Sequence, residues 1–201
     1  MFAINNYNSK KRLDSGVNLI YDLSFPVIAG NDDLIDERFE SIKTILNSQY
    51  SNAVTCVIAD YKNSLLPLKF IENQNICVTN LGDCSNIYGL FELNGDDILV
   101  DANAICSMIA DIRSSFLFGH EMGHKIAKYR ANDATYIQLA NILGISFYDN
   151  QNIIKETFAD ECGNIVCPIR CEHGILPSPL TPNKIEGVKR LVLSTAYKLN
   201  K

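Results

Sequence analysis

Hydrophobic positions in the first half of the chain follow two different periods. After a Gly-Asn-Asp-Asp turn, Ile35, Phe39, Ile42 and Leu46 recur at helical spacing, which predicts an amphipathic helix. Short runs rich in Val, Ile, Tyr and Phe follow, separated by Asn, Gly and Asp residues, and these runs predict strands. An Asn-Gly-Asp sequence before the last run predicts a hairpin there. The predicted strands cover residues 53–59, 76–79, 87–93 and 98–101.

From about residue 103 the period becomes helical, and the remaining predicted elements are helices, with a proline-rich loop at residues 167–179. Gly144 and Pro168 are typical stop signals for helices, and Thr181-Pro182 is a typical start. The order of a helix, a small sheet and then more helices predicts an α+β fold with a mostly antiparallel sheet. We expect a single zincin-like domain over residues 1–201, with its core at about 33–170 and its sheet packed on the helix that carries the chemistry. The predicted helices cover residues 103–128, 132–143, 150–166 and 181–199.

Composition and charge narrow the class of protein. The chain has 201 residues, of which 47% are apolar and 20% charged, as in an ordinary globular domain. Eighteen basic and 23 acidic residues give a net charge of −5, which argues against nucleic acid or anionic lipid as a direct partner. Apolar runs are too short to span a membrane, and the basic residues 10–12 precede Leu-Asp-Ser, where a signal peptide has its apolar core. Seven cysteines, an odd number, favour reduced and mostly buried thiols, so we expect a cytoplasmic protein.

The strongest chemical motif lies in the helix predicted over residues 103–128. His120, Glu121 and His124 form an H-E-x-x-H sequence, and a spacing of four puts both imidazoles on one helix face, where they can bind the same metal ion. Glu121 points about 100° away from His120, beside the metal position. There its carboxylate can take a proton from a zinc-bound water whose pKa the metal lowers to about 7. The motif therefore predicts one zinc ion per chain.

A third ligand is expected from the helix predicted over residues 150–166. Glu156 and Asp160 are four residues apart and share one face. Glu156 can complete a His₂Glu ligand set, and Asp160 can accept the free N–H of a ligating histidine and fix its tautomer. Glu161 and His173 are alternative third ligands, although Glu161 is expected to point elsewhere and His173 lies in a proline-rich loop.

Two further residues are candidates for stabilising the oxyanion that forms when an amide is attacked. His173 and Tyr148 can each donate a hydrogen bond, and both lie in predicted loops. A second, structural zinc site formed with Cys162, Cys167 and Cys171 is not favoured, because their spacing matches no common zinc knuckle.

These motifs together resemble those of ImmA/IrrE-type metallopeptidases. Residues 112–124, which end in F-G-H-E-M-G-H, resemble that family's R-x-F-T-x-A-H-E-x-G-H segment, and residues 156–168 resemble its E-x-x-A-x-x-F-A helix. The resemblance covers about residues 75–170. It implies a gluzincin-like fold, zinc bound by His120, His124 and Glu156, and Glu121 as general base. Gly119 replaces a usual alanine, a change expected to be harmless, Asp160 replaces a frequent asparagine, and Gly163 stands where larger residues are common.

The resulting hypothesis is a zinc-dependent endopeptidase that acts on a protein or peptide. The substrate strand is expected to pair with an exposed sheet edge at 98–101, and Glu121 to pass the proton of the zinc-bound water to the leaving amine. By resemblance, the substrate is a helix-turn-helix repressor. A second resemblance, carried by residues 156–160 and Tyr148, is to lethal-factor-like and proline-specific peptidases that act on extracellular or host proteins. A zinc-binding interaction domain without turnover is the alternative outside enzymes, and the oligomeric state stays open.

Overall fold

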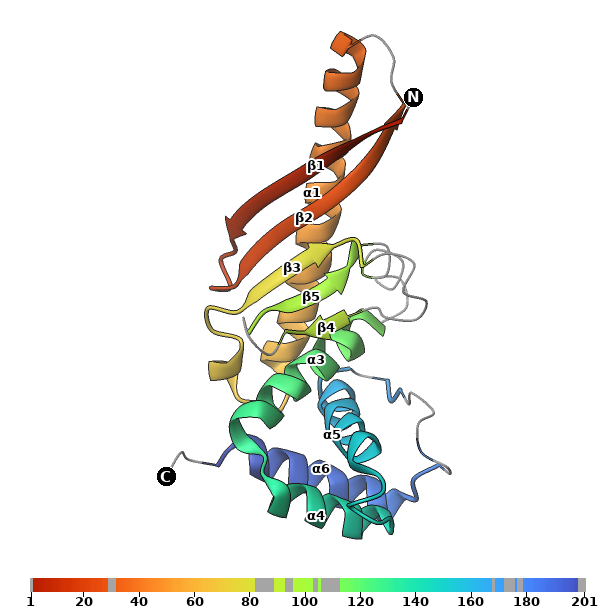
Figure 1. The fold of residues 1–201 in the computed structure, drawn as a ribbon. Coiled ribbons are helices and arrows are strands. Elements are labelled where there is room, and N and C mark those ends of the chain that lie inside the picture. The colour runs from red at the N-terminus through yellow and green to blue at the C-terminus, as the bar shows by residue number, and fades with distance from the viewer. Residues whose placement is uncertain are drawn as a thin grey trace. The chain divides into compact units, whose positions relative to one another are not determined.

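The computed structural model describes residues 2–28, 32–81, 89–92, 96–102, 105, 113–167, 169–171, 176 and 179–198. Its fold is α+β, as the sequence predicts, and Figure 1 shows the elements. The chain divides into a sheet unit, residues 1–58 and 72–114, and a helical unit, residues 59–71 and 115–201. The strands are β1 (Phe2–Arg12), β2 (Asn18–Ile28), β3 (Asn75–Thr79), β4 (Gly89–Phe91) and β5 (Ile98–Asp101). The helices are α1 (Asp32–Asn63), the short 3₁₀ helix η1 (Leu68–Phe70), α3 (Arg113–Arg130), α4 (Asp133–Leu143), α5 (Gln151–Val166) and α6 (Pro182–Ala196).

The sheet is mixed and open, with the strand order β1-β2-β3-β5-β4. The outer pairs β1–β2 and β4–β5 are antiparallel, and the latter is the predicted hairpin, whereas β2–β3 and β3–β5 are parallel. The prediction of a mostly antiparallel sheet holds only for the outer pairs, because the connection from β2 to β3 runs through a long helix and so returns the chain in the same direction. The prediction that residues 98–101 form an exposed edge of the sheet is wrong. β5 lies between β3 and β4, and the edges among the described strands are β1 and β4.

The first two strands form a hairpin that the sequence analysis does not predict. Alternate residues Val17, Leu19, Tyr21 and Leu23 are buried, which is the two-residue period of a strand with one face on a core. Gly16, with φ of 84°, occupies the turn between the strands, in the left-handed region that a residue without Cβ adopts without strain. The partner strand β1 contains polar runs, Asn-Asn and Ser-Lys-Lys, which give no alternating apolar pattern in the sequence.

Helix α1 continues well past the helix that the sequence predicts. Residues 53–59, predicted as a strand, belong to it. The buried side chains are Tyr50, Ala53, Val54, Val57, Ile58 and Tyr61, and their spacing of three and four is that of one helix face. The strand prediction fails because a β-branched run of Val, Thr, Val and Ile has high β-propensity, and burial against the core outweighs that preference.

The helices after residue 113 agree with the predictions. Asn132 caps α4 through a reciprocal hydrogen-bond pair with Thr135, Gly144 ends α4 in the left-handed conformation, and Pro182 occupies the first turn of α6. Residues 102 and 105 are helical, and the remainder of the stretch predicted as helix before 113 lies outside the described residues. Within the described part of the chain, no helix is long and apolar enough to cross a membrane.

The helical unit has its own core. Helices α4, α5 and α6 contact one another in pairs (Figure 1). Lys184 of α6 donates to the carbonyl oxygen of Leu143 at 2.6 Å and so ties α6 to the end of α4. The buried side chains of this core come from helices α3, α4, α5 and α6. They include Phe118, Met122 and Ile126 of α3, Leu139 of α4, Phe158 and Cys162 of α5, and Val188 and Val192 of α6.

Candidate metal centre

The H-E-x-x-H sequence lies within α3, as predicted. Met122 is fully buried and points into the core, while His120 and His124 lie one turn apart on another face. The imidazole rings are edge to face with centroids 4.7 Å apart, and the two Nε2 atoms are 3.0 Å apart. The His120 ring is buried and that of His124 is partly exposed, so one side of the pair remains open to solvent.

Helix α5 supplies two carboxylates to this pair. One oxygen of Glu156, Oε2, lies 3.3 Å from Nε2 of His120 and 3.6 Å from Nε2 of His124. Asp160, one turn further along α5, lies 2.9 Å from Nδ1 of His120. His120, His124 and Glu156 thus bring three potential ligand atoms together within 4.8 Å of one another. These are the three ligands that the sequence predicts, with Asp160 at the position predicted to fix the histidine tautomer.

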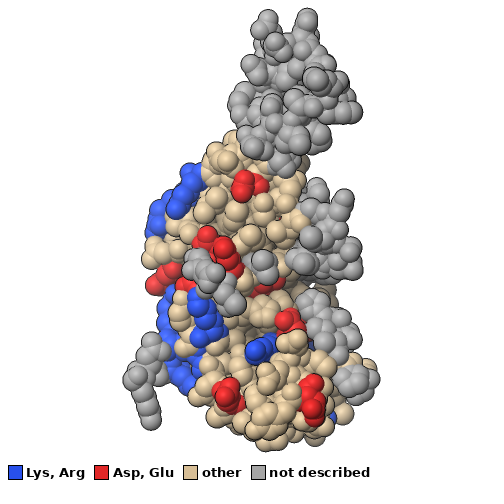
Figure 2. All heavy atoms as spheres, in the orientation of Figure 1, with Lys and Arg blue, Asp and Glu red and all other residues tan. Residues whose placement is uncertain are grey.

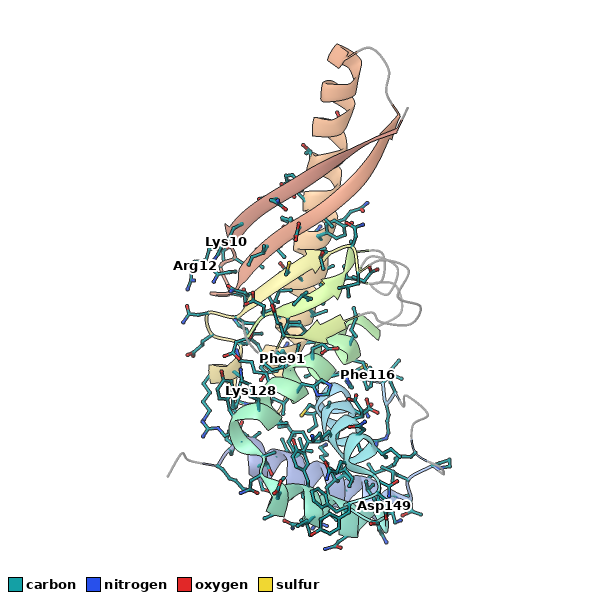
Figure 3. The ribbon with its side chains drawn as sticks, in the orientation of Figure 1. Lys10, Arg12, Phe91, Phe116, Lys128 and Asp149 are labelled. Atoms are coloured by element: carbon teal, nitrogen blue, oxygen red, sulfur yellow. The ribbon has the colours of Figure 1, made fainter. Side chains whose placement is uncertain are left out.

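Helices α3 and α5 come close enough to form this cluster because neither carries a large side chain where they cross. A Cβ atom built on Gly119 would lie 2.9 Å from the Cα of Gly163, and one built on Gly123 would lie 2.7 Å from the Cα of Ala159. A Cβ atom on Gly163 would in turn meet Phe116 of α3 at 2.8 Å (Phe116 is labelled in Figure 3). Helix separation depends on the side chains at the contact, so these small residues determine how far Glu156 lies from the histidines.

This contact gives Gly119 a role that the sequence does not reveal. An alanine at position 119 would not fit in this chain, because its methyl group would collide with the backbone of Gly163. The signal was present in the sequence and was missed: Gly119 and Gly123 are four apart on α3, and Ala159 and Gly163 are four apart on α5. Small residues at a spacing of four on both helices indicate two faces that can approach closely.

The electrostatics of the cluster favour a cation at its centre. Burial lowers the pKa of His120, but hydrogen bonds to Asp160 and Glu156 and the charge of Glu121 outweigh it and raise the pKa to about 9. Hydrogen bonds to His120 and His124 lower the pKa of the Glu156 carboxyl well below its usual range. The carboxylates therefore stabilise positive charge between the rings, whether it comes from a proton or a metal ion.

The donor set also fits a zinc ion in number and spacing. When Nδ1–H of His120 donates to Asp160, the neutral ring has a lone pair on Nε2, and this lone pair faces the Glu156 oxygen at 3.3 Å. Two acceptors facing each other need a cation between them. Ligand atoms about 2.0–2.1 Å from a tetrahedral zinc ion are about 3.3 Å apart, and the three separations here are 3.0, 3.3 and 3.6 Å.

The other predicted catalytic residues differ in their placement. Glu121 is buried in α3, and its negative charge is close enough to contribute to the raised pKa of His120. Tyr148 is 81% exposed, packs against Phe147, and lines a shallow surface concavity with residues 149–153 (Asp149 is labelled in Figure 3). That concavity contains none of the three ligand residues. His173 lies outside the described residues, so the roles predicted for it stay predictions.

Glu161 is engaged elsewhere. Its carboxylate is buried and forms an ion pair of 3.0 Å with Arg170, in the segment after α5. Burial raises the pKa of Glu161, and Arg170 offsets part of that rise. The expectation that Glu161 points away from the histidines is confirmed.

The described cysteines are thiols and not disulfides. Cys162 and Cys167 are buried as expected, Cys77 and Cys171 are partly exposed, and Cys56 is exposed on α1, so burial is less general than the sequence analysis predicts.

Comparison with known proteins identifies no relative of this chain. No protein-family model, no curated protein and no solved structure matches this chain. The resemblance to ImmA/IrrE-type metallopeptidases therefore stays a prediction that depends on the two helical motifs.

Proposed function

We propose that the protein is a zinc-dependent endopeptidase, with His120, His124 and Glu156 as ligands of one zinc ion. The observation that carries the proposal is the convergence of two imidazole nitrogens and one carboxylate oxygen while Asp160 holds the far nitrogen of His120. A partly buried cluster in which imidazoles and carboxylates converge is costly to fold unless its groups bind something, so it indicates a site and not a packing feature.

Each residue has a role in amide hydrolysis. Zinc, when bound, supplies a Lewis acid that polarises the scissile carbonyl group and makes water acidic enough to attack at neutral pH. Glu121 takes the proton of the attacking water and passes it to the nitrogen of the leaving amine, as a general base and then a general acid. Asp160 keeps the proton of His120 on Nδ1, so that Nε2 remains a ligand. Glu121 separates this proposal from a purely structural site, which needs no such base.

The substrate class comes from the resemblance. We propose a protein substrate cleaved at one site, and a helix-turn-helix repressor is the form that the family implies.

The experiment compares four proteins, the wild type and three variants, for zinc content and for cleavage of co-expressed proteins encoded beside the gene. Wild type is expected to hold about one zinc ion per chain, and Glu156→Ala to lose it. Glu121→Gln is expected to keep zinc and fold while cleavage falls about 10²- to 10⁴-fold. Glu186→Gln, on the exposed face of α6, is the matched control and should change neither. Cleavage that persists unchanged in Glu121→Gln would contradict the catalytic role, and zinc without any cleavage would favour a binding domain without turnover.

A further inference from the structure

Three of the large apolar side chains exposed in the described part of the chain lie on two segments of the helical unit that a hydrogen bond brings together. Leu65 is 57% exposed, Leu68 is 49% exposed, and Tyr197, after the end of α6, is 59% exposed. The hydroxyl group of Tyr197 donates to the carbonyl oxygen of Leu65 at 3.1 Å, which brings the end of α6 against the segment before η1. We call these three residues the Leu–Tyr patch. Apolar side chains gathered in this way, and not scattered singly, are typical of an interaction surface.

The patch is held in place by the structure beneath it. Ser64 donates to the carbonyl oxygen of Tyr61 at 2.7 Å and accepts from the amide of Leu66 at 3.2 Å. The buried hydroxyl group of Tyr61 donates to the carbonyl oxygen of Pro67 at 3.1 Å. Because these bonds fix the backbone on both sides of Leu65, the backbone of this segment has little conformational entropy left to lose on binding.

The segments around the patch carry a net positive charge, although the whole chain has a net charge of −5. Segments 59–72 and 186–198 contain five basic and three acidic residues; among the acidic ones, Asp60 accepts from Ser115 and Glu186 pairs with Arg190. Lys62, Lys69 and Lys198 are exposed within these segments. Figure 2 shows Lys and Arg side chains gathered along one flank of the helical unit.

We propose that the Leu–Tyr patch is a docking site for a protein segment that combines acidic and apolar side chains. Leucine or phenylalanine side chains of the segment would cover the patch, and its carboxylates would pair with the surrounding lysines. The docking site does not depend on the metal centre, and it holds whether or not the chain is a peptidase.

Two other occupants fit less well. In a two-fold symmetric dimer the patch would face its own copy, so lysines would lie opposite lysines. An anionic membrane would attract the lysines but repel a chain of net charge −5, and three apolar side chains offer little area for insertion.

The test is fluorescence anisotropy with a labelled 14-residue synthetic peptide that carries Leu, Phe, Asp and Glu at helical spacing. Mass spectrometry after the measurement checks that the peptide is still intact. We expect a dissociation constant on the order of 10⁻⁵ to 10⁻⁴ M, weakened several-fold by added salt, since a small patch with exposed charges gives a weak, screened interface. Leu65→Asp/Leu68→Asp should weaken binding at least tenfold and Lys69→Glu at least threefold. The matched control, Ile137→Asp on the exposed face of α4, should not change it.

Variants are compared only when their circular dichroism and melting temperature match the wild type, which is expected because both leucines are largely exposed. Absence of peptide binding, equal binding by the double variant, or equal binding of a peptide with Lys in place of Asp and Glu would each overturn the proposal. If the peptide does not bind, two results would assign the patch to another occupant. Sedimentation of the wild type, but not of the double variant, with phosphatidylserine vesicles would assign it to a membrane. A concentration-dependent dimer of the wild type that the double variant does not form would assign it to a second copy of the chain.

Discussion

Replacing Gly123 by alanine tests whether the crossing of α3 and α5 determines the metal site. The added methyl group would lie 2.7 Å from the Cα of Ala159 and 2.9 Å from the Cβ of Cys162, and ordinary contact begins at 3.4 Å. The two helices must therefore separate by at least about 0.7 Å, because Ala159 presents rigid backbone. Glu156 lies on the same helix as Ala159, so its carboxylate moves with it, by more than the 0.2 Å or so that metal–ligand distances tolerate.

The expected magnitudes follow from this displacement. Overpacking a core lowers the free energy of unfolding by about 1–3 kcal/mol, and replacing glycine by alanine inside a helix raises it by about 0.5–1 kcal/mol. The net loss in free energy of unfolding is about 0–2.5 kcal/mol, which lowers the melting temperature by up to roughly 10 °C for a chain of this size. Zinc affinity should fall at least tenfold, about the loss seen when groups that orient metal ligands are removed.

The assay is a competition titration for zinc with a chromogenic chelator, combined with thermal unfolding. Gly187→Ala is the matched control, because it makes the same change within α6, where the atom nearest to the new methyl group belongs to the Ile142 side chain, at 3.3 Å. It should leave zinc affinity unchanged and stability equal or slightly higher. If Gly123→Ala binds zinc as tightly as the wild type and unfolds at the same temperature, the close crossing does not hold the site together.

Further predictions concern groups outside the ligand set itself. Asp160→Ala should weaken zinc binding about 10- to 100-fold in the same titration while the fold is retained, and unchanged affinity would show that the carboxylate does not orient the histidine ring. The raised pKa of Glu161 means that its contribution to stability is present below the ordinary pKa of a glutamate and is lost as pH rises through the folded-state value. Urea unfolding should therefore show Glu161→Gln gaining stability relative to the wild type as pH rises above 4.5, and a constant difference would contradict this. Arg170→Met should cost about 1–3 kcal/mol near neutral pH, less than for a fully buried pair because this side chain is 32% exposed, and a loss below the error of the unfolding measurement would contradict it. Among the described thiols, Cys56 should react fastest with a maleimide under native conditions. Cys162 should react only on unfolding, because burial raises its pKa, and peptide mapping by mass spectrometry would show an early Cys162 adduct if this is wrong.

The sequence predicts the helical unit well because its signals are local. Helices α3 to α6 each have an apolar face at helical spacing, and Gly144 and Pro182 mark boundaries through their own backbone preferences. The sheet unit is predicted less well because strands are defined by their partners. Residues 53–59 have β-branched side chains that favour a strand, and only burial along a helix face decides otherwise. The order of strands, which removes β5 from the edge, depends on long-range pairing that local patterns do not contain.

The candidate site could be predicted for a similar reason. A spacing of four within one helix places His120 with His124, and Glu156 with Asp160, without any knowledge of the fold. The sequence does not contain the distance between the two helices. That distance depends on Gly119, Gly123, Ala159 and Gly163, whose importance appears only when the crossing is seen in three dimensions.

X-ray absorption at the zinc edge tests the central claim most directly, because the chain also contains seven cysteines that could bind zinc adventitiously. For the protein loaded with one equivalent of zinc, we predict only nitrogen and oxygen neighbours at about 2.0–2.2 Å, including the multiple scattering of two imidazoles. Glu156→Gln should lose the bound ion or alter this spectrum. Sulfur neighbours at about 2.3 Å, or a spectrum unchanged in Glu156→Gln, would contradict a site formed by His120, His124 and Glu156.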